Sequence, residues 1–269
     1  MPQVHPTAIV DDRASLGEGA VVGPWCHIDG EVAIGPNTRL LERVSLKGPL
    51  TLGADNVLYP NACVGFAPQD RKFDPDHDGA GVHIGDRNIL REGVSIHRAT
   101  ADLPTSLGHD NYLMANSHVA HDCRVGSHTM FANGALIGGH VHVGDMVILG
   151  GNAVLHQFCR VGRLALVSGL SGAGQDIPPF CISYKPRRIG SLNLIGLRRA
   201  GLRQHLRPLK SAFRTFFRLQ LPNTVALQRI RDEVGHDPLV AEFVDFIAAS
   251  QRGITPYQSS TLQHPAPNP

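Results

Sequence analysis

An apolar residue at every sixth position constrains the fold of this chain more than any other feature. Two unbroken runs carry this period. The first consists of Val4, Val10, Leu16, Val22, Ile28, Ile34, Leu40, Leu46, Leu52, Leu58 and Val64, and the second of Leu107, Leu113, Val119, Val125, Phe131, Ile137, Val143, Leu149, Leu155, Val161 and Val167. At 42% hydrophobic content, one run of eleven arises by chance roughly once in ten thousand tries per register. A period of six fits neither a 3.6-residue helix nor an alternating strand, and it predicts hexads of one short strand plus a turn.

Three such hexads make one 18-residue coil, and stacked coils form a triangular prism of three parallel sheets. Position i+4 of each hexad is mostly small or β-branched, and glycine often follows position i, which suits a tight turn. Stacking at about 4.8 Å per coil pairs the backbone groups of neighbouring coils and buries one continuous core. The pattern resembles hexapeptide-repeat proteins over about residues 4–175. That resemblance implies a left-handed parallel β-helix, whereas the period alone gives no handedness.

The rest of the chain has a different organisation. We expect a mainly β domain at residues 1–180, with loops at 65–82 and 98–106, followed by an α-helical domain at 181–253. The paired prolines Pro178 and Pro179 end the repeat, and the apolar spacing from 191 to 250 is helical. A Pro-, Ser- and Gln-rich tail at 254–269 is expected to be disordered.

The composition and the N-terminus bear on the cellular compartment of the protein. No apolar stretch approaches 18 residues, so we expect no membrane span. The N-terminus does not resemble a signal peptide, and three of the five cysteines fall at the small i+4 position. Reduced, buried thiols in a cytoplasmic protein are the prediction.

The net charge is only +2, but acidic and basic residues are distributed unevenly along the chain. Residues 177–230 contain no Asp or Glu but carry many basic residues, which include Lys185, Arg187, Arg188, Arg198, Arg199, Arg203, Arg207, Lys210, Arg214 and Arg218. A field of one sign attracts an acidic partner or phosphates, although a solvated helical face is the alternative. We expect no nucleic acid partner, because no basic motif is interleaved with aromatic residues.

Coil arithmetic brings polar residues to one edge of the prism. Hexads that start at 10, 28, 46 and 64 share a face, and those at 96, 119, 137 and 155 continue it. The residues placed along that edge are His97, His118, His121, Gly139, His140, His156 and Gln157. Both insertions leave from the same column, and loops beside clustered polar groups on a rigid scaffold are typical of functional sites. Outward-facing polar residues without a shared role are the alternative.

Several motifs recur in order along the chain. They are Gln69-Asp70-Arg71-Lys72, Ile84-Gly85-Asp86-Arg87-Asn88, Ser95-Ile96-His97-Arg98, Ala120-His121-Asp122-Cys123, Gly138-Gly139-His140, Val154-Leu155-His156-Gln157-Phe158 and Gln175-Asp176-Ile177-Pro178-Pro179. With the helical C-terminus, they resemble the family of acyl-ACP–UDP-N-acetylglucosamine O-acyltransferases, where ACP is acyl carrier protein. The resemblance implies transfer of a 3-hydroxyacyl group to the 3-position of UDP-N-acetylglucosamine, the first step of lipid A biosynthesis.

The resemblance also implies roles for individual residues. A sugar hydroxyl is a weak nucleophile near pH 7 and needs a base, for which an imidazole is well suited. His121 is that base and Asp122 its orienting partner, while the unobstructed N–H of Gly139 is the expected oxyanion donor. Implied substrate contacts come from Gln69, Asp70, Lys72, His97, His118, His140, His156, Gln157, Gly169, Asn193 and Arg199. His118 and Arg199 would approach the nucleotide phosphates, and Gly169 would help set acyl length.

The family further implies a homotrimer whose active site lies between subunits, with basic helices that dock the acidic carrier protein. No cofactor is expected besides the phosphopantetheine that carries the acyl group, and no metal. A zinc site built from histidines, as in a carbonic-anhydrase class of hexapeptide-repeat proteins, is the less favoured alternative. Lys72 and Gln157 are expected at the same site, and the only acidic residues expected near it are Asp70 and Asp122.

Two positions depart from the family pattern. Ile195 stands where glutamate is common, and Ala200 stands where a second arginine is common beside Arg199. A ligand group left unpaired in a buried site costs about 1–3 kcal/mol. A different sugar nucleotide, a 3-amino sugar that would give an amide, or coenzyme A as donor therefore stay open. A non-catalytic binding module is the third alternative, but binding alone does not require a base beside an oxyanion donor.

Overall fold

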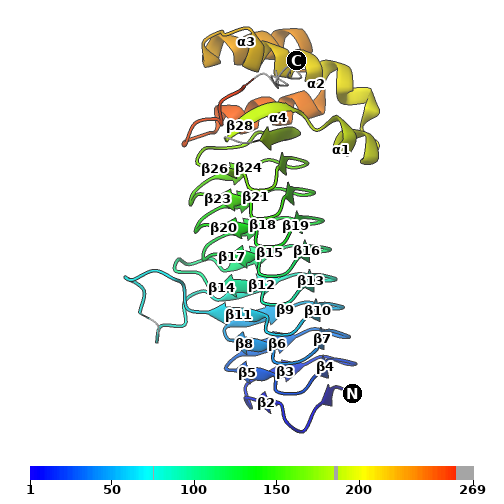
Figure 1. The fold of residues 1–269 in the computed structure, drawn as a ribbon, viewed down its shortest axis with the longest axis vertical. Coiled ribbons are helices and arrows are strands. Elements are labelled where there is room, and N and C mark those ends of the chain that lie inside the picture. Colours follow the sequence, from blue (N-terminus) through cyan, green and yellow to red (C-terminus); the bar gives the residue numbers. More distant parts are fainter. Residues whose placement is uncertain (75, 185–186, 259–269) are drawn as a thin grey trace, which may run out of the picture.

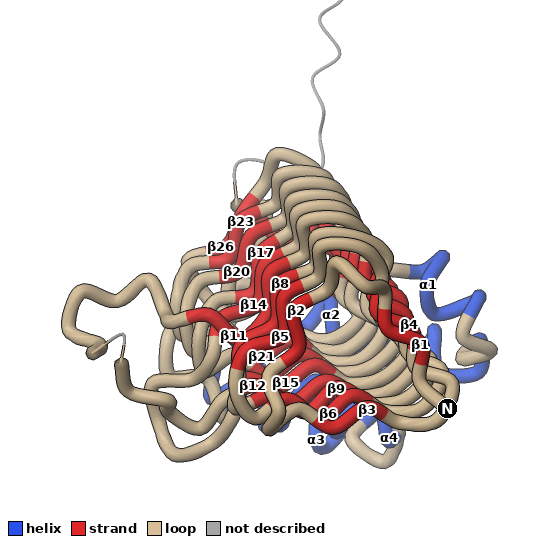
Figure 2. Tube along the Cα trace, turned by 90° about the horizontal axis from the view of Figure 1, so that it is seen from below, coloured by secondary structure: helices blue, strands red, loops and turns tan. Residues whose placement is uncertain are grey.

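The computed structural model describes residues 1–74, 76–184 and 187–258, which form a β-solenoid capped by helices (Figure 1). Figure 2 looks along the solenoid from the N-terminal end. The path from β1 (Gln3–Val4) to β2 (Ile9–Val10) to β3 (Ser15–Leu16) runs anticlockwise as it recedes. The coil is therefore left-handed, which confirms the predicted fold class.

Three parallel sheets form the faces of the prism within the described chain. The eleven-stranded sheet contains β1, β4 (Val21–Val22), β7 (Arg39–Leu40), β10 (Val57–Leu58), β13 (Ile89–Leu90), β16 (Tyr112–Leu113), β19 (Met130–Phe131), β22 (Ile148–Leu149), β25 (Leu166–Val167), β27 (Cys181–Tyr184) and the antiparallel β28 (Arg188–Leu192). The nine-stranded sheet contains β2, β5 (His27–Asp29), β8 (Ser45–Lys47), β11 (Cys63–Phe66), β14 (Ser95–His97), β17 (His118–Val119), β20 (Leu136–Ile137), β23 (Val154–Leu155) and β26 (Gly172–Ala173). The eight-stranded sheet contains β3, β6 (Val32–Ile34), β9 (Leu50–Leu52), β12 (Val82–Ile84), β15 (Thr105–Leu107), β18 (Arg124–Val125), β21 (His142–Val143) and β24 (Arg160–Val161).

The period-six residues fill the prism as predicted. From Val22 to Val167 the members of both runs are buried and form one continuous core. The first coil is the exception, since Val4 is 45% exposed and no coil lies beneath it to cover its side chain. The period-six side chains are therefore fully buried only where a neighbouring coil lies on both sides.

The glycines after position i serve a different purpose from the one predicted. A Cβ on Gly35 would lie 2.5 Å from the backbone carbon of Gly53 in the next coil, so this position is glycine because backbones approach closely there. The left-handed turn residue is instead at i+3, where Asn37, Asp55 and Asp122 have φ of 57°, 57° and 59°. Asn and Asp tolerate this conformation better than most side chains.

The helical end begins later than the expected boundary at residue 180. Strands β27 and β28 first extend the eleven-stranded sheet. The helices then follow as α1 (Leu194–Arg199), the 3₁₀ turn η1 (Arg203–His205), α2 (Leu206–Arg218), α3 (Asn223–Val234) and α4 (Pro238–Ala248). The Asp237 side chain accepts hydrogen bonds from the Leu239 and Val240 N–H groups and so caps α4.

The segment after α4 corrects the expectation of a disordered tail from residue 254. Ile254 forms a bridge with Asp176, and Tyr257 forms one with Ile189. The Tyr257 ring also packs edge-on against Phe213 of α2. The expected disorder at 259–269 lies outside the described residues. In the part of the chain that the structure describes, no helix is long and apolar enough to cross a membrane.

Candidate active site

The register of the nine-stranded sheet brings the predicted edge residues together. Ile96 pairs with Val119, Val119 with Ile137, and Ile137 with Leu155, as the coil arithmetic predicted. Each turn after these strands thus stacks directly on the turn of the neighbouring coil. We call the five histidines that lie in or directly beside these turns the histidine edge: His97, His118, His121, His140 and His156. Its rings are close, with centroids 4.8 Å apart for His97 and His118 and 5.2 Å apart for His121 and His140.

His121 and Asp122 form the shortest polar contact of this edge. The Nδ1 atom of His121 lies 2.6 Å from Oδ2 of Asp122, and their side chains are 16% and 6% exposed. Because the carboxylate is ionised, Nδ1–H donates to it, and in the neutral form of such a ring the Nε2 atom keeps its lone pair. An imidazole held in this tautomer can accept a proton at Nε2.

Asp122 is fixed by the insertion at 98–106. Thr100 Oγ1 donates to Oδ2 at 2.6 Å, and the N–H groups of Thr100 and Ala101 each donate to Oδ1 at 3.0 Å. Burial would raise the pKa of the Asp122 carboxyl, but the hydrogen bonds from Thr100, His121 and Ala101 outweigh it and lower the pKa. The carboxyl is therefore ionised at neutral pH.

Gly139 lies directly against the His121 ring. A Cβ at this position would be 2.6 Å from Cε1 and 2.7 Å from Nε2 of His121. Among the described residues, no acceptor is found for the Gly139 N–H. The site thus combines an available N–H donor with an imidazole nitrogen that can take a proton, on adjacent coils.

His97 and His118 are neutral at pH 7. Burial, together with the nearby His118 and His121, lowers the pKa of His97 to about 4. Burial and His121 also lower the pKa of His118, against the opposing hydrogen bond from Ser95. Nδ1 of His118 lies 2.8 Å from Ser95 Oγ, whereas the buried Nδ1 of His97 has no partner in the described structure.

The upper end of the histidine edge includes residues that the sequence did not single out. The Phe158 ring stacks on His140, with centroids 4.5 Å apart and planes 6° apart. Arg252, in the segment after α4, donates to the Gly174 carbonyl at 3.1 Å and lies 3.3 Å from Nδ1 of His156. Arg252 falls outside any periodic pattern, and Phe158 is adjacent to Gln157 in a quoted motif but had no assigned role.

The loop that carries Gln69, Asp70 and Lys72 extends away from the prism (Figure 1). All three residues are exposed, and Asp70 Oδ1 accepts the Lys72 N–H at 3.0 Å. Buried Arg98 anchors the loop through the carbonyls of Gly65 and His77. In the described part of one chain, no hydrogen bond or ion pair joins the three residues to His121.

Two of the predicted nucleotide-binding residues, Asn193 and Arg199, lie away from the histidine edge. Asn193 caps α1 through the Gly196 N–H and donates to the Leu164 carbonyl, so its amide is already satisfied within the chain. Arg199 is exposed at the end of α1. Figure 2 places α1 on the side of the prism opposite β17 and β20. One chain therefore does not bring Arg199 to His121.

The remaining positions are also placed. Ile195 is 62% exposed on α1, and Ala200 is the C-terminal cap of that helix. Gly169 is exposed, and a Cβ there would lie 3.3 Å from the Gly151 carbonyl oxygen. Within the described residues, one group could offer three ligand atoms to a metal, within 4.8 Å of one another, and it consists of His121, Asp122 and His140. Oδ2 of Asp122 already accepts from Thr100 and His121.

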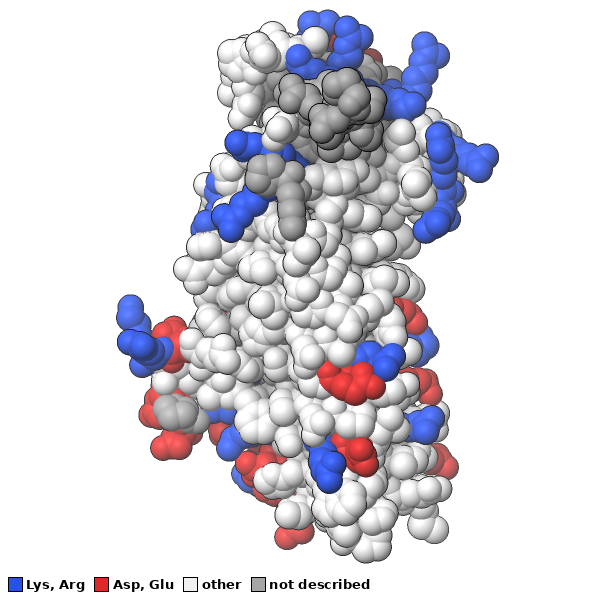
Figure 3. Space-filling view, viewed as in Figure 1, with Lys and Arg blue, Asp and Glu red and all other residues white. Residues whose placement is uncertain are grey.

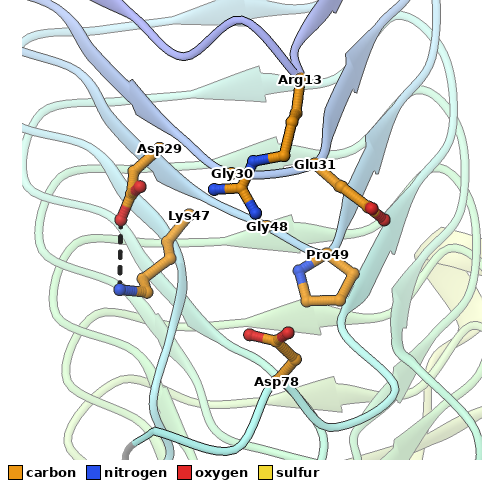
Figure 4. Close-up of a pocket in the computed structure, with 8 residues that line it drawn as sticks. All are labelled: Arg13, Asp29, Gly30, Glu31, Lys47, Gly48, Pro49 and Asp78. Carbon is orange, nitrogen blue, oxygen red and sulfur yellow. Dashed lines mark ion pairs between the residues drawn. The ribbon is translucent and has the colours of Figure 1, made fainter.

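A hollow of about 180 Å³ lies on the early coils, away from the histidine edge (Figure 4). Its lining consists of Arg13, Asp29, Gly30, Glu31, Lys47, Gly48, Pro49 and Asp78. Lys47 and Asp29 form an ion pair at 3.1 Å. None of the predicted site residues lines it.

Comparison with known proteins shows the family of this chain. A curated acyl-[acyl-carrier-protein]–UDP-N-acetylglucosamine O-acyltransferase from Thermodesulfovibrio yellowstonii is 38% identical over 258 residues, covering 94% of this chain and 99% of the relative. This chain belongs to the UDP-N-acetylglucosamine O-acyltransferase family. A relative of the same name from Halorhodospira halophila is 41% identical, again over 94% of this chain and 99% of the relative.

Other comparisons support membership of this acyltransferase family. The family profile "Udp N-acetylglucosamine O-acyltransferase; Domain 2" matches residues 176–255, and the bacterial transferase hexapeptide profile matches 104–139. The solved UDP-N-acetylglucosamine acyltransferase of Francisella novicida superposes with a TM-score of 0.90 at 33% identity, covering 94% of both chains. That of Acinetobacter baumannii gives 0.89 at 35% identity, covering 94% of this chain and 99% of the other. The predicted family and enzyme class are confirmed.

Proposed function

We propose that this acyltransferase moves a 3-hydroxyacyl group from acyl carrier protein to the 3-hydroxyl of UDP-N-acetylglucosamine, the first step of lipid A biosynthesis. The observation that carries the proposal is the hydrogen-bonded His121–Asp122 pair with the Gly139 N–H directly beside it. Relatives named for this reaction match the chain over nearly its full length. We place the reaction in the cytoplasm, in keeping with five unpaired cysteines.

Groups of the chain and of its substrates account for every proton transfer and bond change of the proposed reaction. Nε2 of His121 takes the proton of the sugar hydroxyl while that oxygen attacks the thioester carbonyl. The Gly139 N–H donates to the oxyanion of the tetrahedral intermediate. Collapse of the intermediate breaks the C–S bond, and the imidazolium returns its proton to the phosphopantetheine thiolate. We propose no metal and no cofactor besides that phosphopantetheine.

Substrate binding is assigned by resemblance and by position. Gln69, Asp70, Lys72, His140, His156 and Gln157 contact the sugar or the reacting groups, with His97 beside them. His118 and Arg199 serve the nucleotide, Asn193 holds the start of α1 for nucleotide binding through the Gly196 N–H, and Gly169 limits the acyl chain. Helix α1, which carries Arg199, and strand β17, which His121 follows, lie on opposite sides of one chain, so the joint use of the two residues requires a second subunit. We therefore propose a homotrimer with the site between neighbours.

Mixed trimers test this shared site. His121→Ala and Arg199→Ala proteins should each be impaired at low UDP-N-acetylglucosamine, since one lacks the base and the other a phosphate partner. Unfolding and refolding an equimolar mixture should restore activity, because about a quarter of interfaces then combine His121 of one subunit with Arg199 of its neighbour. The readout is initial rate against that of an unmixed control. Activity no higher than the average of the two variants would contradict a site between subunits.

The carrier protein is proposed to dock on the helical end. Lys and Arg side chains dominate that end of the face seen in Figure 3. Arg203, Arg207, Lys210 and Arg214 are exposed there and form no ion pair with any described residue. Carrier proteins are acidic, and surface charge of one sign accelerates the encounter of opposite charges.

Arg214→Glu should raise KM for the acyl carrier protein by about tenfold at low salt while kcat changes little, since it weakens encounter rather than chemistry. The difference should shrink as salt screens the charges. Arg39→Glu, which reverses an exposed charge on β7, is the matched control and should leave KM unchanged. An equal effect of both substitutions would argue against docking on α2.

A second acceptor stays a candidate because Ile195 and Ala200 replace polar partners. The assay compares UDP-N-acetylglucosamine with its 3-amino analogue, using 3-hydroxyacyl carrier proteins of several lengths. Hydroxylamine cleaves an ester product and spares an amide. Preference for the hydroxyl acceptor supports the proposal, and preference for the amine supports the alternative.

A further inference from the structure

The insertion at 98–106 ends a hydrogen-bond chain that reaches the candidate base. Thr100 Oγ1 donates to Asp122 Oδ2, which in turn accepts from Nδ1 of His121, and both distances are 2.6 Å. We propose that Thr100 is a positioning residue of the transferase: its hydroxyl orients Asp122 and thereby sets the tautomer and direction of the His121 ring. This inference rests on the proposed function.

The hydrogen-bond capacity of Asp122 is fully used in this arrangement. An ionised carboxylate offers about four lone-pair positions. Oδ1 accepts the N–H groups of Thr100 and Ala101, and Oδ2 accepts the Thr100 hydroxyl and the His121 ring. Each oxygen therefore has two donors, and the plane of the carboxylate is determined by the insertion rather than by His121 alone.

His140 is the competing partner that makes this orientation matter. Its Nε2 atom lies 3.5 Å from Oδ2 of Asp122, on the coil above His121. Without the Thr100 hydroxyl, Oδ2 has one donor fewer and can turn toward His140. Two imidazoles would then share one carboxylate, and His121 would lose its unique tautomer.

Thr100 can act in this way because its backbone is held on both sides. The Ala99 and Thr105 N–H groups both donate to the Gly81 carbonyl, at 3.1 and 3.2 Å. Neighbouring Arg98 is 1% exposed and bonds to the carbonyls of Gly65 and His77. The insertion is thus tied to the first loop, and Thr100 is not a free surface side chain.

The test compares Thr100→Val, which removes the donor at nearly constant shape, with Thr100→Ser, which keeps it. We expect Thr100→Val to lower kcat by about tenfold to a hundredfold with KM within about twofold, because the loss concerns the reacting base. The acidic limb of the kcat–pH profile should also move, because one hydrogen-bond donor fewer then stabilises the negative charge of Asp122. The other titratable groups near the His121 ring, besides Asp122, are His97, His118 and His140, and they are the same in both variants.

Thr100→Ser should retain wild-type kcat and profile, and Thr51→Val on the exposed face of β9 should have no effect. Unchanged kcat and pH profile in Thr100→Val would overturn the inference. So would an equal loss in Thr100→Ser, which would indicate packing of the methyl group.

A readout independent of turnover separates this inference from the proposed function. In protein labelled with ¹⁵N-histidine, the His121 ring signals are identified by their loss in His121→Ala. The wild type should show one tautomer with the proton on Nδ1, and Thr100→Val should show a mixture. A single unchanged tautomer in Thr100→Val contradicts the role of Thr100, even if no acyl transfer is observed with the substrates tried.

Discussion

Replacing His121 with alanine should lower kcat by between about a hundredfold and ten-thousandfold, the range that a positioned general base contributes. The fold should survive, because the side chain lies at an outer edge while Val119 and Cys123 of the same coil fill the core. Steady-state turnover and a thermal unfolding curve, measured on the same preparation, check both parts.

The matched control is His83→Ala, which removes an exposed histidine from β12 on another face of the prism. It should leave kcat and the unfolding midpoint unchanged. If the His121 variant turned over at a near-normal rate, another group would have to be the base. If it unfolded, the loss of activity would carry no mechanistic information, and His121→Gln would replace it.

Gly139→Ala should cause the second large loss, of about a hundredfold to a thousandfold in kcat. The new methyl group would lie 2.6 Å from Cε1 of His121, so it must displace the ring from Asp122 and crowd the N–H that donates to the oxyanion. Pre-steady-state acyl transfer, which isolates the chemical step, is the appropriate measurement.

Gly151→Ala provides the comparison for this variant. Gly151 lies two residues after the buried Leu149, just as Gly139 lies two residues after the buried Ile137, but a Cβ on Gly151 would meet only the Asn133 carbonyl oxygen at 3.7 Å. It should retain activity within about twofold, since the backbone position is equivalent and the space is free. Equal losses in the two variants would show that any side chain at this turn position is harmful, and the special role of Gly139 would be lost.

The apolar period predicted the column of residues at the site because register in a solenoid follows directly from spacing. Once Val119 and Ile137 share a face, His121 and His140 must occupy neighbouring turns. The same arithmetic needs no knowledge of side-chain contacts. The predicted register also holds across the insertion at 98–106, since Ile96 pairs with Val119 although they are 23 positions apart in the sequence instead of 18.

Contacts made by non-periodic segments could not be predicted in this way. Thr100 lies in an insertion without a repeat, so nothing in its spacing indicates that it reaches Asp122. Arg252 follows the last helix, next to a tail that composition alone marks as disordered, yet it approaches His156. These residues are placed by tertiary packing, which the sequence period does not encode.

The glycines illustrate a different limit. Their recurrence after position i is visible in the sequence and predicted a tight turn, but its cause is the close backbone approach between coils at residues such as Gly35. The turn itself needs a left-handed residue three positions after the core residue, and Asp122 is one of them. The candidate site thus uses a conformation that the repeat already requires of its turns.

One measurement tests the central claim most directly. Purified protein is incubated with 3-hydroxyacyl carrier proteins and UDP-N-acetylglucosamine, and the sugar nucleotide is analysed by mass spectrometry, beside His121→Ala. The account predicts a sugar nucleotide acylated at the 3-oxygen by the wild type, with a preferred chain length, and little product from the variant. A correctly folded protein that forms no such product with any chain length, or equal product from both proteins, would contradict it.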